Sequence, residues 1–423
     1  MIRFLLKGLL RDRHRSLVPI LVVASGVMLA VVFHAWIQGI MSDSIEFNAR
    51  FTSGHVKVMT RAYAENADQM PNDLAITAAD SLIHSLKSSF PDLEWVQRIH
   101  FAGLVDVPDS HQETKVQAPA IGFGLDLLSG NPAEKDRMNI NKALTRGRLP
   151  DKRGEVLLSE EFSRKLGIHP GDRVSLISTT MFGEMSVYNL VVSGTVIFGS
   201  TVLDKGTLIA DINDTRQALN MENACGEILG FLKTGYYDDE VACKMSDSFN
   251  ASVKQPEDEF SPVMKSLKET NNMRVFVEYA SKLMGILIFV FMTAMSIVLW
   301  NAGLLGGLRR YGEYGMRLAI GEEKNHVYKT MIYESLLIGV IGSVLGVMVG
   351  MAFAWYLQEY GINFNMMKNA TIMMPTVFKA RISTMTWFIG FIPGVGSTLI
   401  GTMLSGIGIY KRQTAQLFKE LES

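Results

Sequence analysis

The chain has 423 residues, of which 48% are apolar and 20% are charged, and its formal net charge is -1. A nearly neutral chain has no overall attraction to phosphate backbones, so we expect no nucleic acid among its partners. The positive mean hydropathy of +0.17 indicates a membrane protein that also carries a soluble part.

Four apolar runs are long enough to cross a bilayer as helices, which takes about 20 residues. The predicted transmembrane helices cover residues 17–41, 283–308, 331–357 and 385–409. The predicted segments around them are an amphipathic cytosolic stretch at 1–16, an outer domain at 42–282, a cytosolic coupling segment at 309–330, an outer loop at 358–384 and a cytosolic tail at 410–423.

Basic residues gather beside these runs on one side of the membrane. They are Arg3, Lys7, Arg11, Arg13, Arg15, Arg309, Arg310, Arg317, Lys324, Lys329, Lys411, Arg412 and Lys419. Short cytoplasmic segments collect Lys and Arg, so both termini and the segment 309–330 are predicted to be cytoplasmic. Residues 42–282 are then predicted to fold outside, in the periplasm.

The segment 42–282 has the pattern of a mixed α and β domain. Residues 77–88 have helical spacing, whereas 95–107 and 186–197 are rich in β-branched and aromatic residues. Residues 155–158 predict a strand that leads into a short helix, with Ser159 as its N-cap and Gly167 at its left-handed end. The predicted fold is an α-helical membrane protein with four transmembrane helices and a large α+β extracytoplasmic domain between helices 1 and 2.

Both cysteines, Cys225 and Cys243, fall in the outer domain, and two are too few for a zinc cluster. In an oxidising compartment they can form one disulfide, but the sequence does not fix the distance between them. A disulfide and two free thiols therefore stay open as alternatives. The eight histidines lack any metal-ligand spacing, so we predict no metal site and no catalytic residue.

The most specific sequence lies within residues 301–357. An Arg-rich stretch is followed by Glu, an apolar residue and Gly, then by Ala, an apolar residue and Gly, and then by a second Glu before a Gly-rich helix. These places are taken by Arg309, Arg310, Glu313, Tyr314, Gly315, Ala319, Ile320, Gly321 and Glu334. The pattern resembles the FtsX-like permease family, which includes the lipoprotein-releasing permeases and the membrane part of the macrolide exporter.

The resemblance implies the permease subunit of an ABC transporter in the bacterial inner membrane. It implies two copies of a separate ATPase subunit, which binds the ATP and Mg, and a second permease copy or a related permease. It also implies that the chain couples to the ATPase through Arg309, Arg310, Glu313, Tyr314, Gly315, Arg317, Ala319 and Gly321.

The residues themselves support a docking role for the segment 309–330. Its apolar residues Tyr314, Leu318 and Ile320 stand among charges, so the segment can dock on a partner while remaining soluble. An ordinary charged loop between two helices is the alternative. The sequence has no GxxxxGK[ST] phosphate-binding loop, so we expect this chain to bind no cofactor and to be no enzyme, with ATP hydrolysis on another subunit.

Gly342, Gly346 and Gly350 recur every four residues in the third predicted helix. This spacing lets two membrane helices approach closely. The resemblance to the FtsX-like permeases implies that the glycines lie at a helix interface within the bundle or within a permease dimer.

The leading functional hypothesis is mechanotransmission. Closure of the ATPase subunits pushes the coupling segment, and the helices carry that motion to the outer domain. Extraction of a lipid-anchored substrate fits this scheme, with a lipoprotein or a periplasmic carrier as a further partner. The alternatives are an efflux permease for a drug, peptide or toxin with a periplasmic adaptor, and a signalling permease that activates a cell-wall hydrolase. The neighbouring genes would distinguish the three.

Overall fold

The computed structural model of the chain describes residues 13–109, 113–129, 133–253, 257–270, 273–308, 311–363, 373 and 377–411. The predictions for residues 1–12, Arg309, Arg310 and 412–423 lie outside the described residues. The chain divides into two compact units. The first comprises Met1–Met41, Ala280–Asn363 and Val377–Ser423, and the second comprises Ser42–Tyr279 and Phe364–Thr376.

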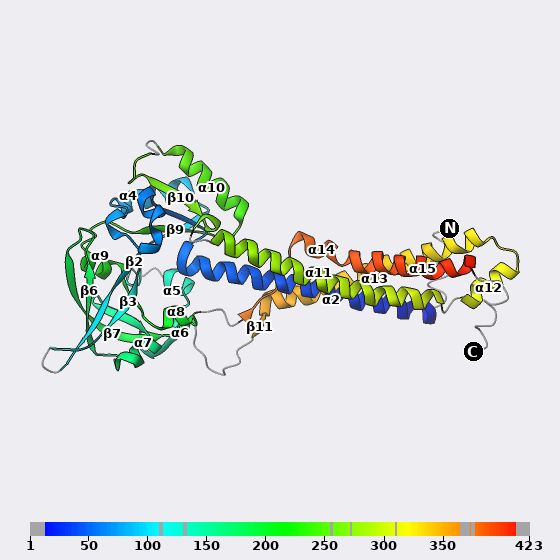
Figure 1. Cartoon of the computed structure of the whole chain (residues 1–423), viewed down its shortest axis with the longest axis horizontal. Helices are drawn as coiled ribbons and strands as arrows, with labels where there is room; N and C mark the ends of the chain where they lie inside the picture. Colours follow the sequence, from blue (N-terminus) through cyan, green and yellow to red (C-terminus); the bar gives the residue numbers. More distant parts are fainter. Residues whose placement is uncertain are drawn as a thin grey trace. The chain divides into compact units, whose positions relative to one another are not determined.

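Long helices lie side by side in the first unit (Figure 1). The helices are α2 (Arg13–Asn48), α11 (Met273–Leu308), α12 (Tyr311–Ala319), α13 (Lys324–Tyr360), α14 (Thr384–Ile389) and α15 (Thr398–Lys411). A short strand pair, β11 (Ile362–Asn363) and β12 (Val377–Phe378), follows α13. The last seven residues of α2 and the first seven of α11 belong to the second unit.

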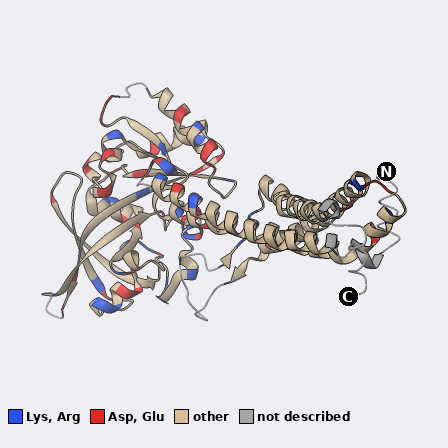
Figure 2. Cartoon of the chain, turned by 45° about the vertical axis from the view of Figure 1, so that its right-hand side comes forward, with Lys and Arg blue, Asp and Glu red and all other residues tan. Residues whose placement is uncertain are grey.

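Four helical stretches among the described residues are long and apolar enough to cross a membrane. They are Leu17–Ser53, Met273–Leu305, Lys324–Tyr360 and Thr384–Ile407. They coincide with the four predicted runs, so the prediction of four apolar helices is confirmed. Figure 2 shows the long helices almost without Lys, Arg, Asp or Glu, whereas such residues are frequent in the second unit.

The helices differ from their predicted bounds, since α2 continues to Asn48 and α13 begins at Lys324. α11 begins at Met273 instead of residue 283, because the charges of its first turns remove them from an apolar run without disfavouring a helix. Arg274 and Glu278 even form an (i, i+4) ion pair, with 3.0 Å between Nε and Oε1. The fourth helix is interrupted by a π-helical segment at Ile392–Ser397, where Pro393 has no N–H to donate.

The second unit is a mixed α+β domain. Its strands among the described residues are β1 (Val56–Thr60), β2 (Leu93–Pro108), β3 (Thr114–Leu125), β4 (Leu144–Gly147), β5 (Glu155–Ser159), β6 (Arg173–Thr179), β7 (Met185–Val196), β8 (Thr207–Asp211), β9 (Glu227–Leu232) and β10 (Pro262–Ser266). Its α-helices are α3 (Arg61–Glu65), α4 (Ala79–Ser89), α5 (Ala133–Arg137), α6 (Ile140–Ala143), α7 (Glu160–Leu166), α8 (Thr201–Asp204), α9 (Ile212–Leu219) and α10 (Asp239–Ser252). The expected strands at 95–107 and 186–197 are β2 and β7, and the expected helix at 77–88 is α4.

The strands pair in the order β10-β1-β9-β2-β3-β8-β5-β7-β4, and β6 pairs with both β2 and β7. The strands β2, β3, β8, β5, β7 and β6 therefore form a closed circuit of pairs (Figure 1). Strand β2 pairs with two different strands along its length. Leu93 to Arg98 pair with β9, and the residues from Ile99 onward pair with β3. Its first half thus extends the β10-β1-β9 sheet and its second half belongs to the closed circuit.

The turn from β5 into α7 matches its prediction in position and differs in one contact. Gly167 ends α7 in the left-handed conformation, with φ of 68°, as predicted. Ser159 occupies the N-cap position, but its hydroxyl donates to the carbonyl oxygen of Asp204 at 2.8 Å and does not accept from the helix. The predicted side-chain cap is therefore wrong, because that hydroxyl is used to bind the end of α8.

Both cysteines are free thiols in the structure. Cys225 is buried in the main core of the second unit, and burial raises the pKa of its thiol to about 12. The Sγ of Cys243 lies 3.8 Å from Ser266 Oγ. A buried thiol with a raised pKa is unreactive at neutral pH.

Candidate functional site

Helix α12 lies at the centre of the predicted coupling segment. Its first turn carries Glu313, a favourable charge at the positive end of a helix. At the other end the Gly321 N–H donates to the Leu318 carbonyl and the Glu322 N–H donates to the Arg317 carbonyl, each at 3.1 Å. Gly321 has φ of 102°, so these bonds form a Schellman motif that ends the helix sharply.

An ion pair reinforces this helix end. Arg317 donates from Nε and Nη2 to the two carboxylate oxygens of Glu322, at 2.6 and 2.5 Å. The hydrogen bonds hold the pKa of the Glu322 carboxyl below its usual value and raise the pKa of Arg317. A bidentate pair fixes direction as well as distance, so it sets the angle of the turn between α12 and α13.

One face of α12 packs on α13. Tyr314 is buried against Val327 and Met331, and the half-buried Leu318, one turn further on, packs on the same cluster. Gly315 is also buried. Side chains at i and i+4 share a helix face, so Tyr314 and Leu318 fasten α12 to the start of α13.

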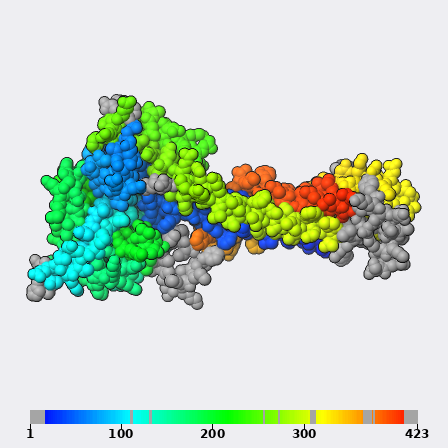
Figure 3. Space-filling view, viewed as in Figure 1, coloured from blue at the N-terminus to red at the C-terminus, as the bar shows by residue number. Residues whose placement is uncertain are grey.

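The opposite face of α12 is exposed. Glu313 is on the surface, and the side chains of Met316 and Ile320 are 51% and 81% exposed. The spacing i, i+3, i+7 places these three on one side. Figure 3 shows side chains of α12 and the start of α13 in yellow on the molecular surface. Ala319 is exposed too, whereas Arg309 and Arg310 lie outside the described residues.

The glycine stripe of α13 faces α2. A Cβ added at Gly346 would lie 2.6 Å from the Ala24 carbonyl oxygen and 2.7 Å from Val27 Cβ. The same holds one turn to either side, where the nearest side chains are those of Val23 and Val31. The pairs are Gly342 with Val23, Gly346 with Val27 and Gly350 with Val31. A ridge of valines thus fills a groove that the glycines leave open, and this brings the two backbones close together.

Hydroxyl groups join α13 to the fourth helix. Thr402 Oγ1 donates to Ser335 Oγ at 2.8 Å, and Ser335 Oγ donates to the Thr398 carbonyl oxygen at 3.2 Å. All three residues are buried. Helices α12, α13 and α15 and α2 are therefore linked by direct contacts within the first unit.

Within the described part of the chain, no group of three or more His, Cys, Asp or Glu side chains could hold a metal ion. The arrangement around α12 is a short helix with an exposed apolar and acidic face that packs on a long apolar helix.

Sequence reasoning found the glycine stripe and missed its partner. The signal was present, because Val23, Val27 and Val31 repeat with the same four-residue period as the glycines. Two stripes of equal period, one large and β-branched and one without side chains, are complementary in shape. Sequence reasoning also missed the buried ion pair of Arg98 with Glu134 in the second unit, for which the sequence has no such signal.

A family model described as FtsX-like permease C-terminal matches residues 285–414. The chain is 23% identical over 238 residues to the lipoprotein-releasing system transmembrane protein LolC of Haemophilus influenzae. The aligned region covers 54% of this chain and 56% of that protein. The chain is 21% identical over 209 residues to LolC of Xylella fastidiosa, with 48% of each chain covered. The chain thus spans about half the length of these curated relatives.

A second group of relatives is similar over a shorter length. The chain is 23% identical over 159 residues to the macrolide export ATP-binding/permease protein MacB of Mannheimia succiniciproducens, which covers 35% of this chain and 25% of that protein. Among solved structures, the periplasmic region of MacB from Actinobacillus actinomycetemcomitans aligns at 13% identity with a TM-score of 0.35, covering 54% of this chain and 93% of that one.

Proposed function

We propose that this chain, which carries an FtsX-like permease domain over residues 285–414, is the membrane subunit of an ABC transporter and that α12 is its docking site for the ATPase. The observation that carries the proposal is the exposed face of α12, where Glu313, Met316 and Ile320 lie together inside the matched domain. Apolar side chains of this size are seldom left in water without a partner when they stand in a compact group.

The packing of α12 suits it to receive a force. Tyr314 and Leu318 fasten it to α13, and the Arg317–Glu322 pair fixes the turn between them. A push on the exposed face therefore moves α13 instead of merely bending a loop. Two ATPase copies, a second permease copy or a related permease, and ATP with Mg held by the ATPase complete the proposed assembly.

The proposed orientation rests on the basic residues. They support an orientation with both termini and α12 in the cytoplasm, the second unit in the periplasm of a bacterium, and four helices in the inner membrane. Work on the outer side then comes from motion transmitted through the helices, and no channel for substrate is required.

We propose that the substrates are lipoproteins, which the transporter releases from the inner membrane. The supporting observation is the similarity to LolC proteins, which covers about half of each chain. Export of a small molecule is the second candidate, because MacB relatives are similar over about a third of this chain.

The test is co-purification with the ATPase from native membranes. The variants Met316→Glu and Ile320→Glu put charges on the exposed face without touching the contacts of Tyr314 with α13. Loss of a central apolar contact costs about 1–3 kcal/mol, so the affinity for the ATPase, and with it ATPase recovery, should fall about fivefold or more in each variant. The matched control is Glu240→Lys, a charge reversal on the exposed surface of α10, which should leave recovery unchanged. Normal ATPase recovery with both α12 variants would overturn the docking assignment.

A further inference from the structure

Helix α2 ends in the second unit with a π-helical turn, Ala49–Ser53. The last carbonyl groups of any helix lack partners within that helix. Here the Arg98 guanidinium of strand β2 supplies hydrogen-bond donors for such carbonyl groups. Its Nη1 donates to the carbonyl oxygens of Arg50 and Phe51 at 2.6 and 3.3 Å. The Arg98 side chain is fully buried.

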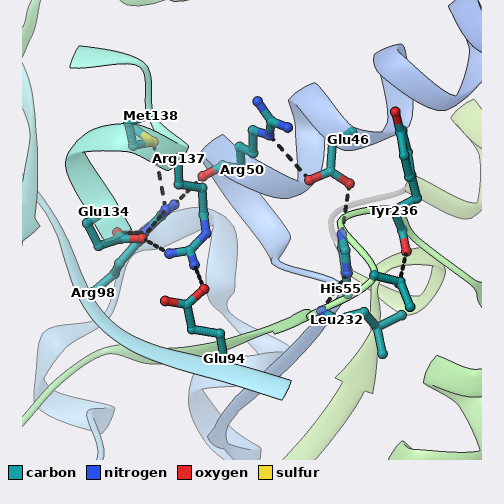
Figure 4. A network of polar contacts seen from close by, with 11 residues as sticks. Glu46, Arg50, His55, Glu94, Arg98, Glu134, Arg137, Met138, Leu232 and Tyr236 are labelled. Carbon is teal, nitrogen blue, oxygen red and sulfur yellow. Dashed lines mark hydrogen bonds and ion pairs between the residues drawn. The ribbon is translucent and has the colours of Figure 1, made fainter. Parts of the chain in front are cut away.

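The charge of Arg98 is balanced by Glu134 of α5 (Figure 4). Arg98 donates from Nε at 2.9 Å and from Nη2 at 3.3 Å to the two carboxylate oxygens. Arg137 also donates to Glu134, and it reaches Glu94 at 2.6 Å. Four alternating charges thus connect the end of α2, strand β2 and helix α5.

A second contact holds the preceding turn of α2. The backbone N–H of Leu232 donates to His55 Nδ1 at 2.9 Å, so this nitrogen is an acceptor and carries no proton. The proton must then be on Nε2, which donates to Glu46 Oε2 at 2.8 Å. Glu46 belongs to α2 and Leu232 to β9. His55 therefore joins α2 to the sheet through a chain of directional bonds (Figure 4).

Apolar packing places the start of α11 on the same surface. Ala49 at the end of α2 is buried with Leu229 and Phe231 of β9, and Met273 and Val277 of α11 belong to the same cluster. The two helices that enter the second unit therefore end on the same strand, β9.

We propose that Glu46, His55, Arg98 and Glu134, here called the α2 clasp, are positioning residues that make α2 and the sheet of the second unit move as one body. The inference rests on the proposed function, since it concerns how motion of the membrane helices reaches the outer domain. The path of contacts runs from α12 to α13, from the glycine stripe to the valines of α2, and from the end of α2 through the clasp to β2 and β9.

The chemistry favours positioning over simple stabilisation. A buried ion pair gains little net stability over well-packed apolar side chains, because both charges lose their hydration. What Arg98 provides is direction, since its planar guanidinium binds two backbone carbonyls of the π-helix and two carboxylate oxygens together. A sliding or turning motion of α2 would have to break several of these bonds together.

The test measures a distance within the second unit. Spin labels at Ser44→Cys on α2 and Lys233→Cys after β9, in a Cys225→Ala/Cys243→Ala background, report how α2 lies on the sheet. With the clasp intact, we expect one narrow distribution that is the same without nucleotide and with the ATPase trapped by ATP, Mg and vanadate. The neutral variant Arg98→Met/Glu134→Gln removes the bonds without leaving a lone buried charge, and its distribution should widen or shift between the two states.

The matched control is Arg146→Met/Glu160→Gln. It removes an ion pair of the second unit, with 2.8 Å between Nε and Oε2, that joins β4 to α7 and includes no residue of the clasp. Its distribution should stay narrow. His55→Phe is the second clasp variant, because the ring keeps its place beside Phe231 and Tyr237 and loses both hydrogen bonds. His55→Phe should also widen the distance distribution. If Arg98→Met/Glu134→Gln does not fold, His55→Phe alone tests the clasp.

Narrow and unchanged distributions in the clasp variants would overturn the inference. If no ATPase binds the wild-type chain, the proposed function fails, and the comparison of clasp and control variants without nucleotide still tests the clasp by itself.

Discussion

Glu134 receives hydrogen bonds from Arg98 and Arg137 while it is almost completely buried. Burial by itself would raise the pKa of its carboxyl, but the two guanidinium groups outweigh that effect and hold the pKa below 4.5, its ordinary value. A depressed carboxyl pKa stabilises the fold above the unfolded-state pKa, and this contribution is lost as the pH falls through the folded-state value.

We therefore predict that Glu134→Gln destabilises the protein at pH 7 and that this loss of stability becomes smaller as the pH falls through the folded-state pKa of Glu134. Removing one partner of a buried ion pair costs about 3 kcal/mol, because the remaining guanidinium is left uncompensated. The measurement is thermal unfolding of the full chain in detergent at pH 7 and at a series of pH values below 4.5, with Glu240→Gln as an exposed control. Equal losses of stability at all these pH values would contradict this account of Glu134.

At the scale of residues, the sequence predicts what is local. The α12 residues lie within one short motif, so their exposure and charge can be judged together. Arg98 lies in a strand whose neighbours give no hint of burial, and Glu134, its partner, is 36 positions away. A single arginine in a strand with partial alternation is normally expected on the solvent-exposed face, so nothing in the sequence marked Arg98 as buried.

At the scale of elements, the interface between α2 and α13 follows from two sequence repeats of the same four-residue period. Val23, Val27 and Val31 fit against Gly342, Gly346 and Gly350. No lipid-driven hydrophobic force brings membrane helices together, so close packing of this kind carries the association.

We predict that Gly346→Leu lowers the stability of the folded protein, because the new side chain would meet the backbone of Ala24 and the side chain of Val27. Overpacking costs about 1–3 kcal/mol when neighbours can yield, and here one neighbour is backbone. Gly285→Leu is the control, since a Cβ at Gly285 has open space around it. Thermal unfolding in detergent should separate the two. An equal melting temperature for both variants would show that the stripe does not depend on close approach.

The strands were predicted better than their pairing. Residues 95–107 and 186–197 have a β pattern, and both are strands. That β6 pairs with β2 on one side and β7 on the other depends on segments far apart in the chain. Alternation along a strand indicates which of its two faces is buried, but it does not indicate which other strand pairs with it. The start of α11, residues 273–282, was missed for a different reason, because a hydropathy window rejects a charged helix end.

For the whole molecule, the contacts of α12, α13 and α2 lie in the first unit, and the α2 clasp lies in the second unit. Helix α2 is continuous from Arg13 to Asn48 and has residues in both units. The path can transmit work only if something pushes on α12, so the identity of its partner is the point on which the account depends.

The most direct test is photocrosslinking from position 320 in native membranes. A benzoylphenylalanine in place of Ile320 puts the reactive group on the exposed face of α12, and the same group in place of Ile286 on α11 is the control. We expect position 320 to yield an adduct with a cytoplasmic ABC ATPase, identified by mass spectrometry, and position 286 to yield none with that protein. Adducts from position 320 only with lipid or with periplasmic proteins would contradict both the docking role of α12 and the orientation of the chain.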